Sequence, residues 1–114
     1  MSRGFGVELR RLRVREKLTQ RQLAELLGVT NSYLSKLETG EGSPGEELVR
    51  GIAEQLAGDE EMLLVLAGKV PPALAERAGQ DEEFARFLRL LPNVSEDGLG
   101  ICYAAALYHQ VPPR

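Results

Sequence analysis

Cys102 and His109 are the first side chains to consider for catalysis, since a thiol and an imidazole can act together as nucleophile and base. They do so only within hydrogen-bond reach of each other. The apolar residues around them have helical spacing, and seven residues of helix would separate the two by about 10.5 Å along the axis. One cysteine and one histidine also cannot supply a usual zinc site. The sequence therefore predicts no enzymatic activity, no cofactor and no bound metal.

Two other patterns resemble functional motifs without the context these need. The spacing Gly-x-Gly-x-x-Gly at residues 40–45 matches a dinucleotide-binding loop, but Pro44 lies inside it and no strand precedes it. Acidic residues 59–61 and 81–83 lie at predicted helix starts, where carboxylates interact favourably with the helix dipole. We interpret these patterns as turn and capping features.

Charge is divided unevenly along the 114 residues, whose net charge is −3. Residues 1–40 hold eight basic and four acidic side chains, whereas the remainder holds six basic and thirteen acidic ones. The basic end can meet phosphates and the acidic body cannot, so the pattern predicts one-sided contact with nucleic acid. A single cysteine excludes an internal disulfide, and no apolar run is long enough to span a bilayer. We expect a cytoplasmic protein with no membrane contact.

Capping signals predict a series of short helices in residues 1–68. A first amphipathic helix covers residues 5–16, with its arginines on the solvent face. Thr19 opens a second helix with a Thr-x-x-Gln capping box, and Gly28 ends it. Thr30 caps a third helix that Gly40 ends.

Two more helices complete this predicted domain. Ser43 is expected to cap the fourth helix, with Pro44 at its first position, Glu46 closing a capping box and Gly58 at its end. The fifth covers residues 60–67. Residues 68–72 read as a hinge, because two prolines forbid a continuous helix there. Beyond it we expect helices at 73–78, 82–91 and around 99–106. The predicted domains are thus residues 1–68, and a helical extension of residues 69–114.

The pattern Gln20-x-x-Leu23-Ala24-x-x-x-Gly28-Val29-x-x-x-x-Leu34-x-x-Leu37 is the most specific in the chain. Two short helices can cross steeply on a turn of three or four residues only if the contact positions are small or apolar. Ala24 allows the close approach, the glycine makes the turn, and the leucines fill the space between the helices. The pattern therefore predicts a helix-turn-helix, with a generic helical hairpin as the alternative.

Through these residues, and through Leu18-Thr19-Gln20-Arg21 and Tyr33-Leu34-Ser35-Lys36-Leu37-Glu38-Thr39-Gly40, the chain resembles the Xre family of helix-turn-helix regulators, which includes lambda repressor and Cro. The resemblance covers residues 4–67. It implies an all-α fold, a five-helix lambda repressor-like DNA-binding domain with a short helical C-terminal extension. It also implies that the third helix enters the major groove of a palindromic operator bound by a homodimer, so that the protein regulates transcription, as a repressor in our interpretation.

The resemblance assigns roles to individual positions. Base contacts fall on Asn31, Ser32, Tyr33 and Lys36, and phosphate contacts on Gln20, with Arg21, Ser35, Thr39 and Ser43 as weaker candidates. Amide and ammonium groups suit such contacts, since Asn pairs with adenine and Lys with guanine or phosphate. Glu38 is acidic, so we expect it to be a structural partner of a basic residue or of backbone groups.

The extension carries apolar side chains for which we expect a dimer contact, with packing against the first domain as the alternative. These side chains are Phe84, Phe87, Leu88, Leu91, Leu99 and Tyr103. The same acidic half could instead bind a protein partner, such as a toxin, an antirepressor or a protease. An antitoxin that regulates its own promoter and a protein-interaction module that does not bind DNA therefore remain alternative functions.

Overall fold

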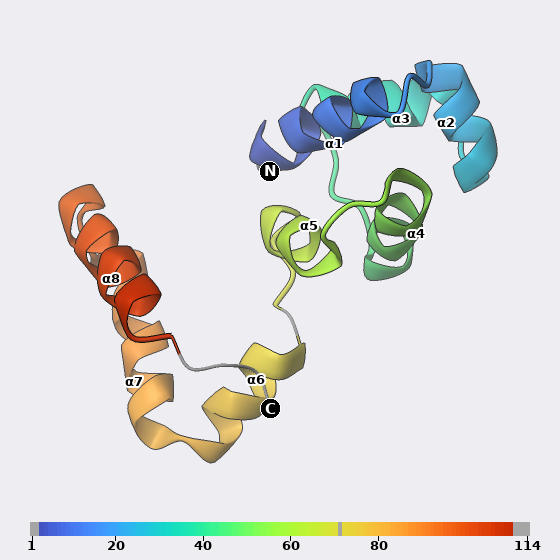
Figure 1. The fold of residues 1–114 in the computed structure, drawn as a ribbon. Helices are drawn as coiled ribbons and strands as arrows, with labels where there is room; N and C mark the ends of the chain where they lie inside the picture. The colour runs from blue at the N-terminus through green and yellow to red at the C-terminus, as the bar shows by residue number, and fades with distance from the viewer. Residues whose placement is uncertain (1–2, 71, 111–114) are drawn as a thin grey trace. The chain divides into compact units, whose positions relative to one another are not determined.

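The computed structural model describes residues 3–70 and 72–110, and within them the chain forms eight α-helices, a short 3-10 turn and no strand (Figure 1). The predicted all-α fold is confirmed. The chain divides into two units, Met1–Pro72 and Ala73–Arg114. The sequence places this boundary four residues earlier, at residue 68. The first unit holds five helices. The second holds the remaining three, except for Pro72, the first residue of the sixth helix.

The helices of the first unit are short and closely packed. Their bounds are α1 (Arg3–Arg15), α2 (Gln20–Leu27), α3 (Asn31–Glu38), α4 (Glu46–Leu56) and α5 (Glu60–Leu66). Helix α3 packs against both α1 and α2, while α4 packs against α5 and α2 (Figure 1). Helix α1 also contacts α4 and α5. Helix α3 is therefore held from two sides within this unit.

The core of the first unit is built from aliphatic side chains and one phenylalanine. The chain contains no tryptophan. Every helix contributes to it, and burying each large apolar side chain is worth about 1.5 to 3 kcal/mol. The buried apolar residues are Phe5, Leu9, Leu12, Leu23, Ala24, Leu34, Leu37, Val49, Ile52, Ala53, Leu56, Leu63, Leu64 and Ala67.

The caps of α2 and α3 follow the sequence signals. The Thr19 hydroxyl accepts from the Gln22 backbone N–H, and the Gln22 side chain accepts from the Thr19 N–H, which forms the predicted capping box. Gly28 takes the left-handed conformation at φ 72° that ends α2. Thr30 accepts from the Tyr33 N–H at 3.0 Å and caps α3. Gly40, at φ 88°, follows the end of α3 as expected.

The predicted start of the fourth helix is wrong. Helix α4 begins at Glu46 with Gly45 as its N-cap, and no side chain caps it. Ser43 is therefore not the cap, and Pro44 does not occupy the first helical position. The Pro44 side chain is instead fully buried. Packing of this ring in the core overrides the local capping signal, because burial of apolar surface is worth more than one cap bond.

The end of α4 also differs from the prediction. The helix ends at Leu56, and Ala57 takes the left-handed conformation at φ 50°. Gly58 lies one position beyond this turn. A Cβ at Gly58 would come within 2.9 Å of the Leu12 side chain. This glycine thus permits a close approach to α1 and does not itself make the left-handed turn.

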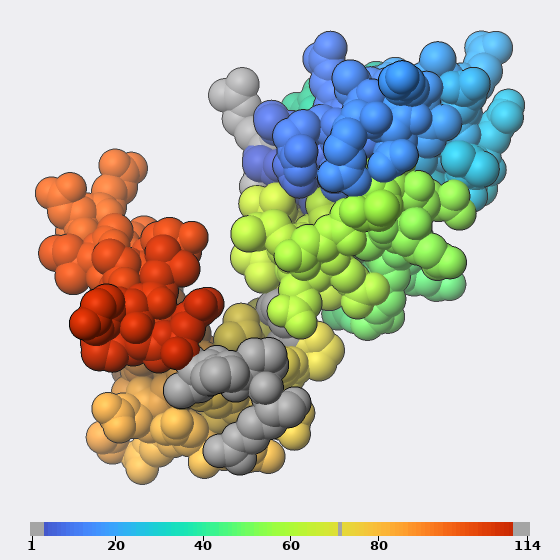
Figure 2. Space-filling model, viewed as in Figure 1, coloured from blue at the N-terminus to red at the C-terminus, as the bar shows by residue number. Residues whose placement is uncertain are grey.

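The second unit contains α6 (Pro72–Gln80), α7 (Glu82–Leu90), the 3-10 turn η1 (Leu91–Asn93) and α8 (Glu96–Tyr108). Asp81 caps α7 and Ser95 caps α8, so the acidic residues near 81–83 lie at a helix start as expected. No side chain in the described part of this unit is buried. Figure 2 shows these helices as space-filling surfaces.

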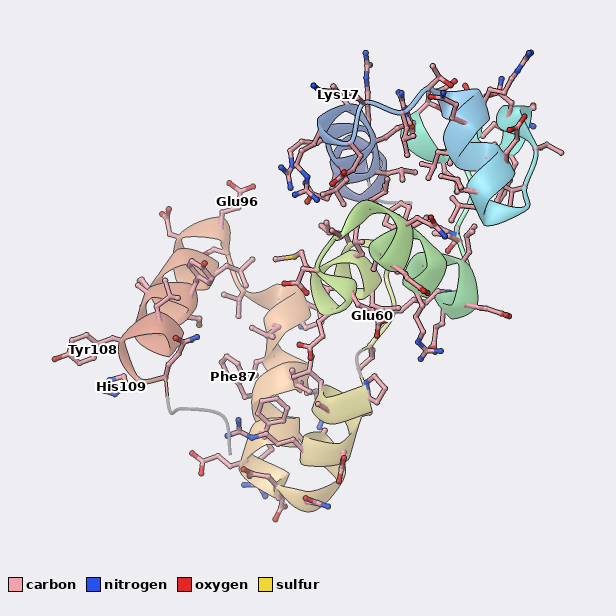
Figure 3. The ribbon with its side chains drawn as sticks, turned by 45° about the vertical axis from the view of Figure 1, so that its right-hand side comes forward. Lys17, Glu60, Phe87, Glu96, Tyr108 and His109 are labelled. Atoms are coloured by element: carbon pink, nitrogen blue, oxygen red, sulfur yellow. The ribbon has the colours of Figure 1, made fainter. Side chains whose placement is uncertain are left out.

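Apolar side chains of the second unit are therefore left in contact with solvent. Tyr108 is 86% exposed and extends outward from the end of α8 (Figure 3). Ile101 and Tyr103, also on α8, are exposed as well. No helix among residues 3–70 and 72–110 has both the length and the apolar character needed to cross a membrane.

Candidate nucleic-acid interface

Helix α3 presents two different faces. Asn31 and Ser32, in its first turn, are exposed, and so is Lys36 in its last turn. Leu34 and Leu37 lie on the opposite side and are completely buried in the core. The helix is thus anchored by its apolar side, while the polar side chains predicted to contact bases face away from the core.

Tyr33 and Ser35 lie between these two faces. The Tyr33 ring is half-buried and packs against the edge of the core, so part of it remains accessible. Ser35 is also half-buried. Thr39, just after α3, is exposed, but its hydroxyl donates to the Lys36 carbonyl at 3.0 Å. Thr39 therefore has no hydroxyl proton to offer a phosphate while that bond persists.

The turn between α2 and α3 sets the angle between these helices. Gly28 and Val29 donate backbone N–H bonds to the Glu25 and Ala24 carbonyls, which closes the end of α2 in two residues. Thr30 then starts α3 at once. Ala24 is 3% exposed, and its side chain is only a methyl group, so little bulk lies where α2 meets α3. These features match the small and apolar positions that a helix-turn-helix requires.

Glu38, at the end of α3, accepts hydrogen bonds from one side chain of α1 and one of α2. The Arg13 guanidinium of α1 donates to both Glu38 carboxylate oxygens, at 2.6 and 3.0 Å. The Gln20 amide of α2 donates to one of the same oxygens at 3.1 Å. Arg13 also donates to the Leu18 carbonyl at 2.8 Å. The predicted structural role of Glu38 is confirmed, and its basic partner is Arg13.

Arg13 itself corrects the sequence analysis, which placed the arginines of the first helix on its solvent face. The Arg13 side chain is 12% exposed and that of Glu38 is 4% exposed. The hydrogen bond to Glu38 raises the pKa of the Arg13 guanidinium, although burial opposes this shift. The guanidinium is thus held in its charged form, and it lies against the Glu38 carboxylate at the end of α3.

Gly6 is a second residue whose role the sequence did not reveal. It is buried where α1 crosses α3. A Cβ at this position would lie 2.5 Å from the Leu37 and Glu38 carbonyl oxygens, far inside any normal contact. The backbones of α1 and α3 therefore approach closely at Gly6, next to the ion pair of Arg13. The available signal was a glycine in the first turn of the helix predicted at residues 5–16, because glycine lowers helix stability unless close packing requires it.

The predicted phosphate contacts lie at different sites. Gln20 is half-buried and Arg21 is exposed, both in the first turn of α2, where unpaired backbone N–H groups favour an anion. Among the described residues, Arg21 and Lys36 form no ion pair, so their charges are available to a ligand. Ser43 is exposed, and the nearby first turn of α4 carries two acidic residues, Glu46 and Glu47.

The side chains predicted to form a dimer contact all lie in the second unit. Phe84 and Leu88 are half-buried on α7, and Phe87, on the same helix, is 42% exposed (Figure 3). The guanidinium of Arg77 lies 4.5 Å from the centre of the Phe84 ring. Leu91, in η1, is half-buried, and on α8 Leu99 and Tyr103 are exposed.

A comparison with known protein families identifies the class of protein to which this geometry belongs. A model of the helix-turn-helix domain matches residues 5–66, which include all of α2 to α5 and most of α1. The chain belongs to this helix-turn-helix family, whose domain implies DNA binding.

Individual relatives are named as regulators of transcription. An HTH-type transcriptional regulator of Mycobacterium tuberculosis is 38% identical over 68 residues, 60% of this chain and 49% of that protein. The HTH-type transcriptional repressor RghR of Bacillus subtilis is 37% identical over 75 residues, 65% of this chain and 56% of that protein. The HTH-type transcriptional activator BcrR of Enterococcus faecalis is 39% identical over 71 residues, 55% of this chain and 34% of that protein. The chain spans about half the length of the curated relatives it matches first.

Proposed function

We propose that this protein is a sequence-specific transcriptional regulator of the Xre type, similar to lambda repressor and Cro, and that it represses transcription from a two-fold symmetric operator. The observation that carries the proposal is the division of α3 into a buried side at Leu34 and Leu37 and an exposed polar side. A rod held in this way fits the major groove, with its first residues at the base edges.

Each exposed side chain of α3 has a proposed partner on the DNA. The Asn31 amide can donate and accept at the same adenine, and the Lys36 ammonium can donate to guanine or to a phosphate. The accessible part of the Tyr33 ring can contact a thymine methyl group. Ser32 can hydrogen bond to any of several bases, so it adds little specificity. Loss of one good base contact costs roughly 1 to 3 kcal/mol.

Gln20 and Arg21 are the proposed phosphate anchors. Their helix terminus supplies N–H groups and a favourable dipole, and the guanidinium supplies charge. The Gln20 amide also donates to Glu38, so one side chain would link the phosphate to the end of α3. Such contacts fix the orientation of α3 in the groove without reading sequence. Ser35, Thr39 and Ser43 remain weaker proposals for phosphate contact.

The test is to select bound sequences from a random DNA pool and then measure variants on the selected operator. We expect Asn31→Ala to weaken binding to the operator by about five- to 150-fold while leaving binding to random DNA unchanged, since about 1.4 kcal/mol is a factor of ten. Gln20→Ala should weaken both DNAs alike. Gln55→Ala on α4 serves as the control and should change neither. If Asn31→Ala leaves discrimination intact, the proposed reading face is wrong.

The direction of regulation needs its own measurement, since the relatives' names include a repressor and an activator. A reporter gene placed behind the selected operator should be transcribed less when the protein is present. An increase in transcription would instead make the protein an activator.

We further propose that the protein binds as a dimer through the second unit, with half-sites about 34 Å apart, which is one turn of DNA. Support comes from the absence of any buried side chain in the described part of this unit and from the exposed faces of α7 and α8. Small domains seldom leave such apolar surface uncovered.

Substitution of exposed apolar residues tests the dimer without disturbing a core. We expect Phe87→Asp combined with Leu99→Asp to convert the protein to a monomer in sedimentation. Val7→Asp, at an even more exposed apolar position in the first unit, should leave the dimer intact. A dimer that survives the double change would remove this role from the second unit.

A further inference from the structure

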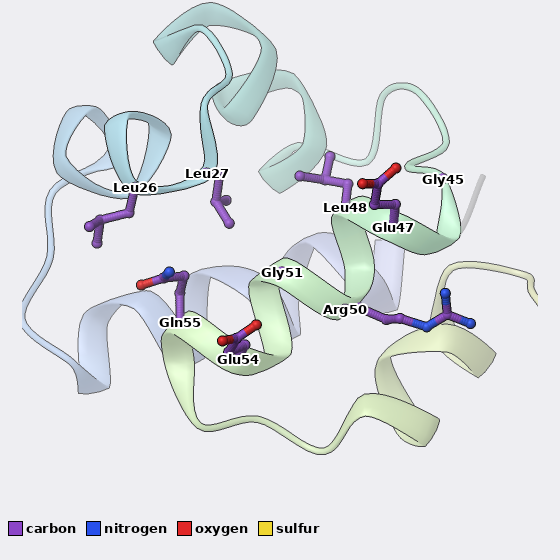
Figure 4. Close-up of a pocket in the computed structure, with 9 residues that line it drawn as sticks. All are labelled: Leu26, Leu27, Gly45, Glu47, Leu48, Arg50, Gly51, Glu54 and Gln55. Atoms are coloured by element: carbon purple, nitrogen blue, oxygen red, sulfur yellow. The ribbon is translucent and has the colours of Figure 1, made fainter.

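A shallow groove of about 700 Å³ runs between α2 and α4 and has no role in the proposed DNA contact (Figure 4). Its lining comes only from α2 and from residues 45–55, and it includes none of the side chains proposed to meet bases or phosphates. The groove is therefore made of residues different from those proposed to contact DNA.

The floor of the groove is apolar. Leu27 and Leu48 are half-buried and lie to either side of Gly51. Gly51 has no side chain, so the groove is not filled at this point. Leu26 stands at the edge with 53% of its surface exposed. It also borders a smaller hollow to which Leu18, just before α2, contributes a second apolar side chain.

The rim of the groove is acidic. Glu47 and Glu54 line it, and Glu25 lines the adjoining hollow. None of these three carboxylates forms an ion pair within residues 3–70 and 72–110. Arg50 is the cation of the lining, but it is turned away toward α5 and lies near Glu46 and Glu60, at 3.4 and 3.9 Å (Figure 4). The unpaired charge at this rim is therefore negative.

From this complementarity we propose that the groove binds a positively charged amphipathic helix of a partner protein. The lined stretch from Gly45, the N-cap of α4, to Gln55 is about 15 Å long, which equals nearly three turns of a partner helix. Leucines of that helix would cover Leu26, Leu27 and Leu48, and its lysines or arginines would meet the carboxylates. This mode of recognition places an apolar helix face in a groove and uses rim charges for orientation.

The proposal goes beyond DNA binding and can fail independently of it. Its probe is a labelled 15-residue helical peptide with leucine on one face and lysine on the other, compared with the same peptide carrying glutamate in place of lysine. Binding to the full chain is followed by fluorescence anisotropy at 150 mM salt. We expect the lysine peptide to bind at least tenfold more tightly than the glutamate peptide.

Two matched variants locate the binding. Leu26→Ala with Glu54→Gln should weaken the lysine peptide about tenfold, because one anchor and one charge leave the groove. Met62→Ala with Glu61→Gln removes an apolar side chain of matching exposure, 52%, and one carboxylate from α5, and should leave affinity within twofold of the wild type. Equal binding by the groove variant and the wild type overturns the proposal. So does an equal loss in both variants, which would show attraction to the net charge alone. Circular dichroism checks that both variants keep their helix content.

Discussion

The pair of Arg13 and Glu38 offers the sharpest test of how α3 is held. Replacing Arg13 with Met keeps the aliphatic stem and removes the charge, and replacing Glu38 with Leu removes the carboxylate. Either change alone leaves one charge in a site where the side chains are 12% and 4% exposed. Removing one partner of a buried pair typically costs 3 to 5 kcal/mol, so we expect about 3 kcal/mol for each single variant.

The double variant should cost much less than the sum of the two. With both charges gone, the site becomes apolar, and such replacements of buried pairs are often close to neutral. We therefore expect a coupling free energy of at least about 2 kcal/mol, because each single variant includes the cost of stranding a charge. The Gln20 amide loses its acceptor in the double variant, which keeps the total cost above zero.

Urea unfolding followed by circular dichroism at 222 nm measures these free energies, and it suits a chain that has no tryptophan. The pair of Arg11 and Glu8 on α1 is the control, since it has the same chemistry but side chains 58% and 27% exposed. Its coupling should be several-fold smaller because solvent screens it. Strictly additive effects for Arg13 and Glu38 would refute the argument that burial makes this pair decisive.

Three other substitutions have defined expectations. Gly6→Ala should destabilise the first unit by at least about 2 kcal/mol, because the added methyl meets two backbone carbonyls of α3 that cannot move aside. Gly79→Ala is the control and should not destabilise the protein, because there is open space around Gly79. Equal melting temperatures for the two variants would contradict the close approach of α1 and α3. Ala57→Gly should raise the melting temperature slightly, because relief of the left-handed strain of about 1 kcal/mol exceeds the entropy that glycine adds to the unfolded chain. The pKa of Glu8 is lowered by its hydrogen bond to Arg11, so the stabilisation it provides is present at neutral pH and is lost as pH falls through the folded-state pKa. An NMR titration should show that this pKa rises in Arg11→Ala, and no rise would place the cause elsewhere.

The sequence predicted the elements whose signals are local. Thr19, Thr30 and Gly28 specify the ends of α2 and α3 through bonds to residues at most five positions away, so their types and spacing are enough. The exposed and buried sides of α3 follow from helical periodicity in the same way. The position of the helix-turn-helix therefore follows from the sequence alone.

What the sequence could not give depends on contacts between distant positions. Arg13 and Glu38 are 25 residues apart, and periodicity alone assigns any arginine to the solvent face. The start of α4 was misplaced because Ser43 and Pro44 form a good local cap, while the burial of the proline ring depends on the assembled core. The contacts made by α7 and α8 are still harder to predict from the sequence, since an apolar helix face does not indicate what it packs against.

Because α3 has a buried side and an exposed side, different residues of this helix maintain the fold and face outward toward a ligand. Leu34, Leu37 and Glu38 carry the packing, whereas Asn31 and Ser32 touch nothing that the core requires. Under the proposed contact of α3 with bases, gene duplicates could exchange the outward side chains and bind new DNA sequences while keeping their thermal stability. Divergent copies of such a domain would differ most at the positions that matter least to folding.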